Sequence, residues 1–235
     1  LTLENITVDG NEDVFSTDAA IVVAGKLFLN AGAIIQKNNN ISTSSDTRGG
    51  GIRSVSESEI KIDGAVIQNN SADSSNGGGL TVYGTLNFLS GTIKSNNAKY
   101  AGAIYIGGTG NVVLEKDSKI EENYSTTNAA AISAYTGAIL TVNGAYIAKN
   151  ESKGPGGAIF ASSDTTIQIN DCIIQENIAE NGSAFYGSGT ITFTSGVVSK
   201  NKTIGKSEND TNTCAAIWIP ANGKFIMQGG SIINN

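Results

Sequence analysis

The sequence contains no histidine, and it has only two cysteines, two prolines and two arginines. Catalytic triads, metal sites and general bases that depend on imidazole are therefore excluded. Two cysteines are also too few for a zinc site. Charged residues make up only 15% of the chain, the net charge is −6, and Arg48 and Arg53 are its only arginines. Without a basic patch for phosphates, we expect no nucleic-acid partner.

Long apolar runs are also missing. No stretch approaches the roughly 20 apolar residues of a membrane-spanning helix, and no signal peptide precedes Leu1. The chain starts within a strand-like alternation, Leu1 to Leu3, and stops on a repeated asparagine. Solenoid ends usually carry polar caps, and neither end supplies one. We therefore expect residues 1–235 to be part of a longer surface protein, without direct membrane insertion of this part.

What the sequence does contain is a repeat. One phrase recurs eight times: a β-branched apolar residue, two variable residues and an asparagine. A second phrase precedes each copy and consists of two small residues and a large apolar one, such as Gly78 to Leu80. The repeated asparagines are Asn38, Asn70, Asn96, Asn123, Asn150, Asn177, Asn201 and Asn235. A period of 24 to 34 residues that runs from end to end predicts a solenoid and a single domain over residues 1–235.

Within each repeat the apolar residues alternate. Leu80 to Val82, Leu86 to Phe88 and Gly91 to Ile93 give three short strands with alternate residues facing inward. Strands that stack on their own equivalents predict a parallel β-helix, all-β, with about eight coils of three strands. The number of residues between a repeated asparagine and the large apolar residue of the following phrase varies more than the spacing within the rest of the repeat. Insertions therefore collect at one corner.

The asparagines predict a ladder that joins the coils. At a bend, asparagine tolerates the left-handed conformation, and its amide can donate to one neighbouring coil and accept from the other. Just before four of them lie Glu122, Lys149, Glu176 and Lys200. A charge in the core would be prohibitive, so we expect these four side chains to point outward and to alternate in sign along the stack.

A second fixed site is small in every coil. Two residues before the β-branched residue, the sequence has Ala33, Ala65, Gly91, Ser118, Ala145, Cys172, Gly196 and Gly230. We expect Cys172 to be buried there as a small apolar residue. Cys214 falls at another corner two coils away, beyond the reach of a disulfide. Both cysteines are therefore predicted to be free thiols.

Carboxylates give no catalytic or metal site in the sequence. Glycoside hydrolysis needs two carboxylates on one face, whereas the loop carboxylates here are scattered: Asp46, Asp73, Glu151, Glu180, Glu208 and Asp210. Such residues could hold calcium in the corner loops, but without a calcium-loop motif solvated charge is the simpler interpretation. We predict no catalytic residue, no cofactor and no metal, and leave calcium in the loops open.

Aromatic residues gather on one expected surface. The outward position of the first strand carries Tyr105, Phe160, Tyr186 and Trp218, and two residues further along lie Tyr83 and Tyr135. We call these six residues the aromatic strip. Such rings stack on sugars or anchor a protein partner. The same column could equally stabilise the sheet without a ligand, or be covered by a neighbouring domain.

The two repeated phrases carry a resemblance to known proteins. Gly156 to Ile159 reads GGAI, and with the Ile-x-x-Asn phrases it resembles the GGAI and FxxN repeats of chlamydial polymorphic outer membrane proteins, with Ile in place of Phe. It is also similar to the adhesin-like β-helix proteins at the surface of gut bacteria and archaea. The resemblance implies a right-handed, single-stranded parallel β-helix with an extracellular or cell-surface location.

Two functions are compatible with these observations. The first is a non-catalytic, adhesin-like domain that binds an extracellular glycan or a cell-surface protein through the aromatic strip. The alternative is a polysaccharide lyase or hydrolase of the pectate-lyase-like fold class. The signature aspartate pairs, Gly-His-Gly and Arg-x-Lys motifs of those enzymes do not occur in this sequence. A fold carries its function in grafted sites, so the repeat itself does not decide between the two.

Overall fold

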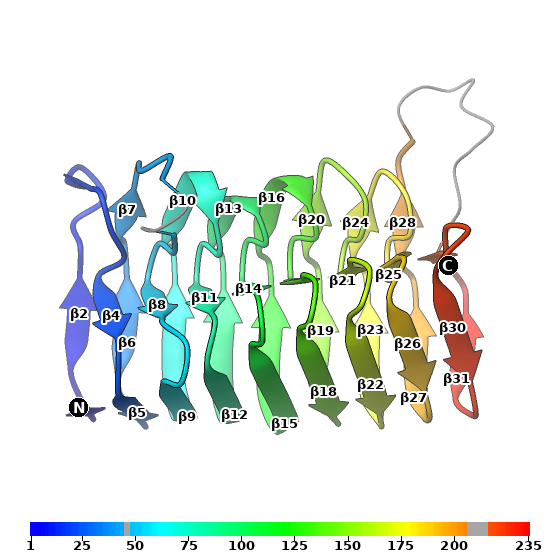
Figure 1. Ribbon diagram of the computed structural model, residues 1–235, viewed down its shortest axis with the longest axis horizontal. Coiled ribbons are helices and arrows are strands. Elements are labelled where there is room, and N and C mark those ends of the chain that lie inside the picture. The colour runs from blue at the N-terminus through cyan, green and yellow to red at the C-terminus, as the bar shows by residue number, and fades with distance from the viewer. Residues whose placement is uncertain (45–47, 206–215) are drawn as a thin grey trace.

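The chain forms a parallel β-solenoid. The structure is a computed structural model that describes residues 1–44, 48–205 and 216–235, and every regular element in these ranges is a strand. The coils stack along one axis from the N-terminus to the C-terminus (Figure 1), and the strands pair in parallel with their equivalents in the next coil. No helix in these ranges could cross a membrane. The predicted all-β parallel solenoid is confirmed.

Each coil contributes to three sheets, which we call the first, the corner and the third sheet. The first sheet holds eight strands, so about seven turns separate its two ends. Its strands are β4 (Ile21–Val23), β8 (Ile52–Ser54), β11 (Leu80–Val82), β14 (Ile104–Ile106), β17 (Ile132–Ala134), β21 (Ile159–Ala161), β25 (Phe185–Gly187) and β29 (Ile217–Trp218).

The corner sheet has fifteen strands and bends around one corner of the solenoid. The strands before the corner are β1 (Thr2–Leu3), β5 (Lys26–Asn30), β18 (Ile139–Asn143), β22 (Thr166–Asn170), β26 (Thr190–Phe193) and β30 (Lys224–Met227). Those after it are β2 (Thr7–Asp9), β6 (Ile34–Gln36), β19 (Tyr146–Ala148), β23 (Cys172–Gln175), β27 (Gly196–Ser199) and β31 (Ser231–Ile233). Three strands run through the corner without a break: β9 (Glu59–Gln68), β12 (Thr85–Lys94) and β15 (Asn111–Glu121).

The third sheet follows the repeated asparagines. Its eight strands are β3 (Phe15–Ser16), β7 (Asn39–Asn40), β10 (Ser71–Asn76), β13 (Asn97–Tyr100), β16 (Tyr124–Asn128), β20 (Glu151–Ser152), β24 (Ile178–Ala179) and β28 (Lys202–Thr203). The sequence interpretation treated these residues as connections, and it separated the two parts of the corner sheet. The number of sheets is therefore as predicted, but their division along the chain differs.

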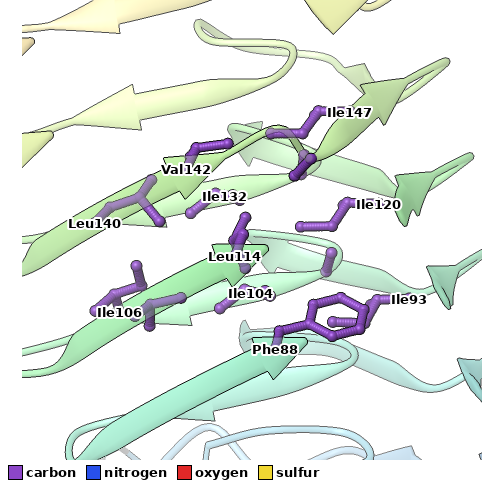
Figure 2. Packing of buried hydrophobic residues seen from close by; sticks show 14 of the residues in the cluster. Phe88, Ile93, Ile104, Ile106, Leu114, Ile120, Ile132, Leu140, Val142 and Ile147 are labelled. Carbon is purple, nitrogen blue, oxygen red and sulfur yellow. The ribbon is translucent and has the colours of Figure 1, made fainter. Parts of the chain in front are cut away.

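The core is a narrow column of stacked apolar side chains. Figure 2 shows Ile93, Ile120 and Ile147 one above the other, and strand pairing places each against the next. All three are fully buried. Each such side chain contributes about 1.5 to 3 kcal/mol relative to remaining exposed. Equivalent residues of successive coils contact one another along the axis. The core therefore repeats once per coil and differs from the single central core of a globular domain.

Backbone geometry at the small site confirms a tight corner. Ala65, Ala145 and Cys172 are fully buried there. The residue just before each is left-handed: φ is 88° at Gly64, 83° at Gly144 and 49° at Asp171. Glycine adopts this conformation without steric cost. A small inward residue next to a left-handed one lets the strand change direction without opening the core.

The asparagine ladder is present along the solenoid. Asn150 Nδ2 donates to Asn177 Oδ1 at 2.9 Å, and Asn150 Oδ1 accepts from Asn123 Nδ2 at 2.9 Å. The same amide donates to the backbone carbonyls of Ile120 at 3.1 Å and Ala148 at 3.0 Å. Asn150 is fully buried. Equivalent Asn-to-Asn hydrogen bonds join all eight repeated asparagines, from Asn38 to Asn235.

One detail of the ladder was predicted wrongly. The left-handed residue is not the asparagine but the residue before it, with φ between 52° and 58° in all eight coils. This conformation turns that side chain away from the core, so charges are tolerated there. The four predicted charges do point outward: Glu122, Lys149 and Lys200 are exposed and Glu176 is half-exposed. None of the ion pairs formed within the described ranges joins two of them.

Substitution of Asn150 by alanine tests the ladder. The change removes five side-chain hydrogen bonds within a buried column, and it leaves the backbone N–H of Asn123 without its Asn150 acceptor and the carbonyl of Ile120 without its Asn150 donor. We expect the free energy of unfolding to fall by about 1 to 3 kcal/mol, as measured by chemical denaturation. Lys119→Ala, on the exposed side of β15, is the control. Equal stability of the two variants would contradict a stabilising ladder.

Cys172 gives a second prediction. Burial raises the pKa of its thiol to about 12, whereas an unfolded thiol ionises at about pH 8.5. The unfolded state therefore loses its proton first as the pH rises, and stability should fall between these values. Cys214 lies outside the described residues, so a Cys214→Ser background isolates Cys172. We expect no reaction with a thiol reagent in the native protein and one reactive thiol in denaturant; rapid native labelling would contradict burial.

Candidate functional site

The predicted outward column lies on the first sheet. Strand pairing places Tyr105 opposite Ser133, Ser133 opposite Phe160, Phe160 opposite Tyr186 and Tyr186 opposite Trp218. The strands involved are β14, β17, β21, β25 and β29, of which β14, β21 and β25 are labelled in Figure 1. The sequence thus predicted correctly which residues share this column, because strict stacking fixes the register once the inward residues are known.

Four rings of the aromatic strip form a continuous stack. The centroid of Tyr135 lies 4.9 Å from that of Tyr105 and 5.7 Å from that of Phe160, and Phe160 lies 5.6 Å from Tyr186. The register explains this order. The coil of Tyr135 has the small Ser133 in the column, and the ring of Tyr135, two residues further along, lies between the rings of the flanking coils.

Tyr83 joins the stack through Arg48. The Arg48 Nη1 atom donates to the Tyr83 hydroxyl at 2.7 Å and to the Tyr105 hydroxyl at 3.4 Å. Its guanidinium carbon lies 5.5 Å from the Tyr105 ring centroid, a cation–π contact. No carboxylate among the described residues pairs with Arg48, whereas Arg53 forms two hydrogen bonds to Asp18, at 2.9 and 2.7 Å.

Sequence reasoning missed Arg48 as a site residue. It lies in the long connection after Asn38, where the repeat has no fixed spacing, so no periodic signal could place it. The same holds for Asn128, whose Nδ2 donates to the Tyr135 hydroxyl at 3.2 Å. Its position at the end of β16 belongs to the third sheet, which the sequence did not reveal. The strip is therefore held by polar residues from outside the first sheet, Arg48 from a connection and Asn128 from the third sheet.

Burial and charge act in opposite directions on two tyrosines of the strip. Tyr105 is only 6% exposed, and burial raises its pKa to about 12 although the Arg48 charge lowers it. Burial also raises the pKa of Tyr135, against the hydrogen bond from Asn128. Both hydroxyls therefore stay neutral at physiological pH and act as hydrogen-bonding groups beside a cation.

Trp218 differs from the rest of the strip. It pairs in register with Tyr186 and is half-buried, but no aromatic ring in the described ranges contacts its indole. Within the stack, by contrast, each ring has an aromatic neighbour: the planes of Phe160 and Tyr186 are 9° from parallel, and the other two pairs are tilted by 31° and 34°. The strip consequently offers ring edges along its middle and an indole without an aromatic neighbour at one end.

The loop carboxylates do not assemble into a metal site in the described part of the chain. No group of three or more His, Cys, Asp or Glu residues there is close enough to hold a metal ion. Asp73 accepts a hydrogen bond from Asn97 Nδ2 at 2.6 Å, and Glu151 pairs with Lys153 at 2.6 Å. The other named loop carboxylates are Glu180, which is described, and Asp46, Glu208 and Asp210, which lie outside the described residues.

Comparison with known proteins adds no relative. No family model, no curated protein and no solved structure matches the chain. The resemblance of its repeats to GGAI and FxxN proteins therefore rests on the phrases themselves, and the function must be argued from the surface.

The high pKa of Tyr105 predicts an alkaline loss of stability. In the unfolded chain its hydroxyl ionises at about pH 10, while the native hydroxyl stays protonated to about pH 12. Stability should decline as the pH rises through this window. Tyr105→Phe keeps the ring in the stack and removes the ionisable group, so its unfolding midpoint should decline less. Parallel declines in both proteins would show that the Tyr105 hydroxyl is not protected from ionisation.

Proposed function

We propose that the chain is a non-catalytic, adhesin-like binding domain of an extracellular or cell-surface protein. The observation that carries this proposal is the aromatic strip, a continuous aromatic and cationic column on the first sheet. Tyr105 is buried and the other five side chains of the strip are half-buried, and contiguous aromatic surface that stays partly accessible on a protein often has a binding role. The partner would be an extended one, a glycan or a cell-surface protein, that contacts several coils at once.

Rigidity supports a binding role for the strip. Strand pairing fixes Tyr105, Phe160, Tyr186 and Trp218 against the neighbouring coil, and the ladder holds the coils in register. A preorganised surface loses little conformational entropy when a partner binds. The mixed chemistry also favours recognition, since Arg48 and the hydroxyls of Tyr83 and Tyr105 add hydrogen-bonding groups beside the rings.

The geometry of the stack limits how a glycan could bind. A sugar packs its C–H face on a free ring face, but the rings from Tyr105 to Tyr186 cover one another. A glycan would therefore contact Trp218 and the ring edges, whereas a protein partner would lie along the edges of the whole strip. Trp and Tyr are the residues that most often dominate such interfaces.

The enzymatic alternative stays open as a second candidate. A parallel β-helix is also the fold of pectate-lyase-like enzymes, so the architecture is compatible with a polysaccharide lyase or hydrolase. No acid and base pair can be named in the described residues, which makes this candidate less well supported than binding. Its signature would be new reducing ends or unsaturated products when polysaccharides are incubated with the protein.

The strip can be tested by intrinsic fluorescence. Trp218 is the only tryptophan, so its emission directly reports binding at the end of the strip during titration with extracellular polysaccharides. Pull-downs test binding of cell-surface proteins separately. We expect Tyr186→Ala and Tyr105→Ala to weaken binding at least about tenfold, as for hot-spot aromatics.

Tyr124→Ala is the matched control, because Tyr124 is a half-buried tyrosine on the third sheet outside the strip. Product analysis on the same polysaccharides tests the enzymatic alternative. The proposal fails if no probe changes the emission or is retained, or if strip variants and the control bind equally. Depolymerised products would replace it with the enzymatic function.

A further inference from the structure

A hollow opens on the outside of the corner sheet, away from the aromatic strip. Its volume is about 630 Å³, and its lining comes from the corners of three successive coils: Lys116 from the first, Asn143, Gly144 and Tyr146 from the second, and Asn170, Asp171 and Ile173 from the third. Sites for small ligands typically measure about 300 to 1,000 Å³. The hollow is thus of suitable size for one small polar molecule.

An extra residue at the corner produces one wall of the hollow. From Leu114 to Ile120 the chain advances six residues, whereas the next coil advances five, from Val142 to Ile147. The pairing of β12 with β15 shifts register at this point, so the extra length projects outward. Bulges of this kind often lie next to binding sites, where they redirect side chains.

The wall lies directly against Gly144. A Cβ atom added at Gly144 would be 3.2 Å from both Cα and Cβ of Lys116, and Gly144 has a φ of 83°. A larger residue would therefore have to displace the wall and adopt a strained backbone conformation. Because glycine has no side chain, the turn at Gly144 can lie against the projecting Lys116 without a steric clash.

The floor of the hollow is apolar. Tyr146 pairs in register with Ile173, and Ile173 with Val197, on the outer face of the corner sheet. Ile173 is 43% exposed and Val197 is 37% exposed, so both present apolar surface to solvent. The Tyr146 hydroxyl accepts a hydrogen bond from Gln175 Nε2 at 3.1 Å, which fixes the ring. No other aromatic ring in the described ranges covers it.

A chain of side-chain amides forms the polar rim. Gln168 Nε2 donates to Asn170 Oδ1 at 3.1 Å, Asn170 Nδ2 to Asn143 Oδ1 at 3.0 Å, and Asn143 Nδ2 to Glu115 Oε1 at 3.2 Å. These bonds orient both asparagine amides. Each NH₂ group has two hydrogens, and the chain uses one from Asn170 and one from Asn143. The second hydrogen of each remains for a ligand.

Two opposite charges complete the rim. Lys116 and Asp171 are exposed, and no ion pair in the described part of the chain includes either of them. An ammonium group donates and a carboxylate accepts, so together with the amides they match hydroxyl groups in both roles. Their charges cancel, and the nearby Glu115 adds a negative one, which disfavours an anionic ligand.

We propose that this hollow binds one sugar residue of a neutral glycan. The C–H face of the sugar packs on Tyr146 and Ile173, while its hydroxyls bond to Asp171, Lys116 and the two amides. An apolar floor with a few oriented polar groups at its rim is the usual composition of such sites. The proposal does not depend on the aromatic strip, which lies on another sheet and has different chemistry.

The test is an NMR titration of the labelled protein with the methyl glycosides of glucose, galactose and mannose at millimolar concentrations, where single sugars bind. We expect at least one to shift the backbone amide signals of Gly144, Tyr146 and Asp171. Tyr146→Ala and Asp171→Asn should each weaken that binding about tenfold or more. Asparagine tolerates the left-handed backbone of position 171, so the second variant keeps the turn folded.

Controls separate this site from the strip. Lys119→Ala changes the residue that pairs with Tyr146 one coil earlier and should bind as the wild type does. Trp218→Ala should also leave the titration unchanged, because it alters only the strip. The proposal is overturned if none of the three glycosides shifts these signals, if both hollow variants bind like the wild type, or if galacturonate binds more tightly than the neutral sugars.

Discussion

The hydrogen bonding of buried asparagine amides is the constraint on which the solenoid depends. A buried amide that lacks partners costs about as much as a large core deletion, so each coil must place its asparagine directly above the previous one. In the ladder every interior amide satisfies its neighbours on both sides, as at Asn150. Register is thereby fixed at one point of every coil. Chain length can vary only where it does not move that point, which explains why insertions collect after the ladder.

Fixed register turns sequence differences between coils into surface features. On the first sheet, Ser133 leaves space in the column and Tyr135 fills it, so a single ring stack passes through coils whose sequences differ. On the corner sheet, one extra residue in the coil of Lys116 cannot be absorbed by a register shift further along. It projects outward and forms the wall of the hollow. Both surfaces follow from the same stacking rule.

Features that recur in every coil could be predicted from the sequence, whereas features that depend on single residues or on short polar strands could not. The ladder, the small corner site and the aromatic column were predictable because each recurs in phase with the coil. The third sheet was missed because strands such as β20 (Glu151–Ser152) are too short and too polar to show alternation. The left-handed position was assigned to the asparagine because the position before it varies among Lys, Asn, Ser and Glu from Lys37 to Asn234 and shows no fixed residue. Arg48 and the hollow depend on single, aperiodic residues.

Inward residues repeat in every coil and outward residues do not, and this difference determines where substitutions can change the function of such a chain. Inward positions must satisfy the core and the ladder in every coil, so substitutions there alter the fold before they alter recognition. Outward positions such as Tyr146 and Ile173 are held by the backbone pairing of their strands and do not take part in the core or in the ladder. A new binding surface therefore needs only outward substitutions or one extra corner residue, with the solenoid unchanged. The repeat phrases consequently specify the architecture, whereas the outer surface differs from coil to coil through its aperiodic residues.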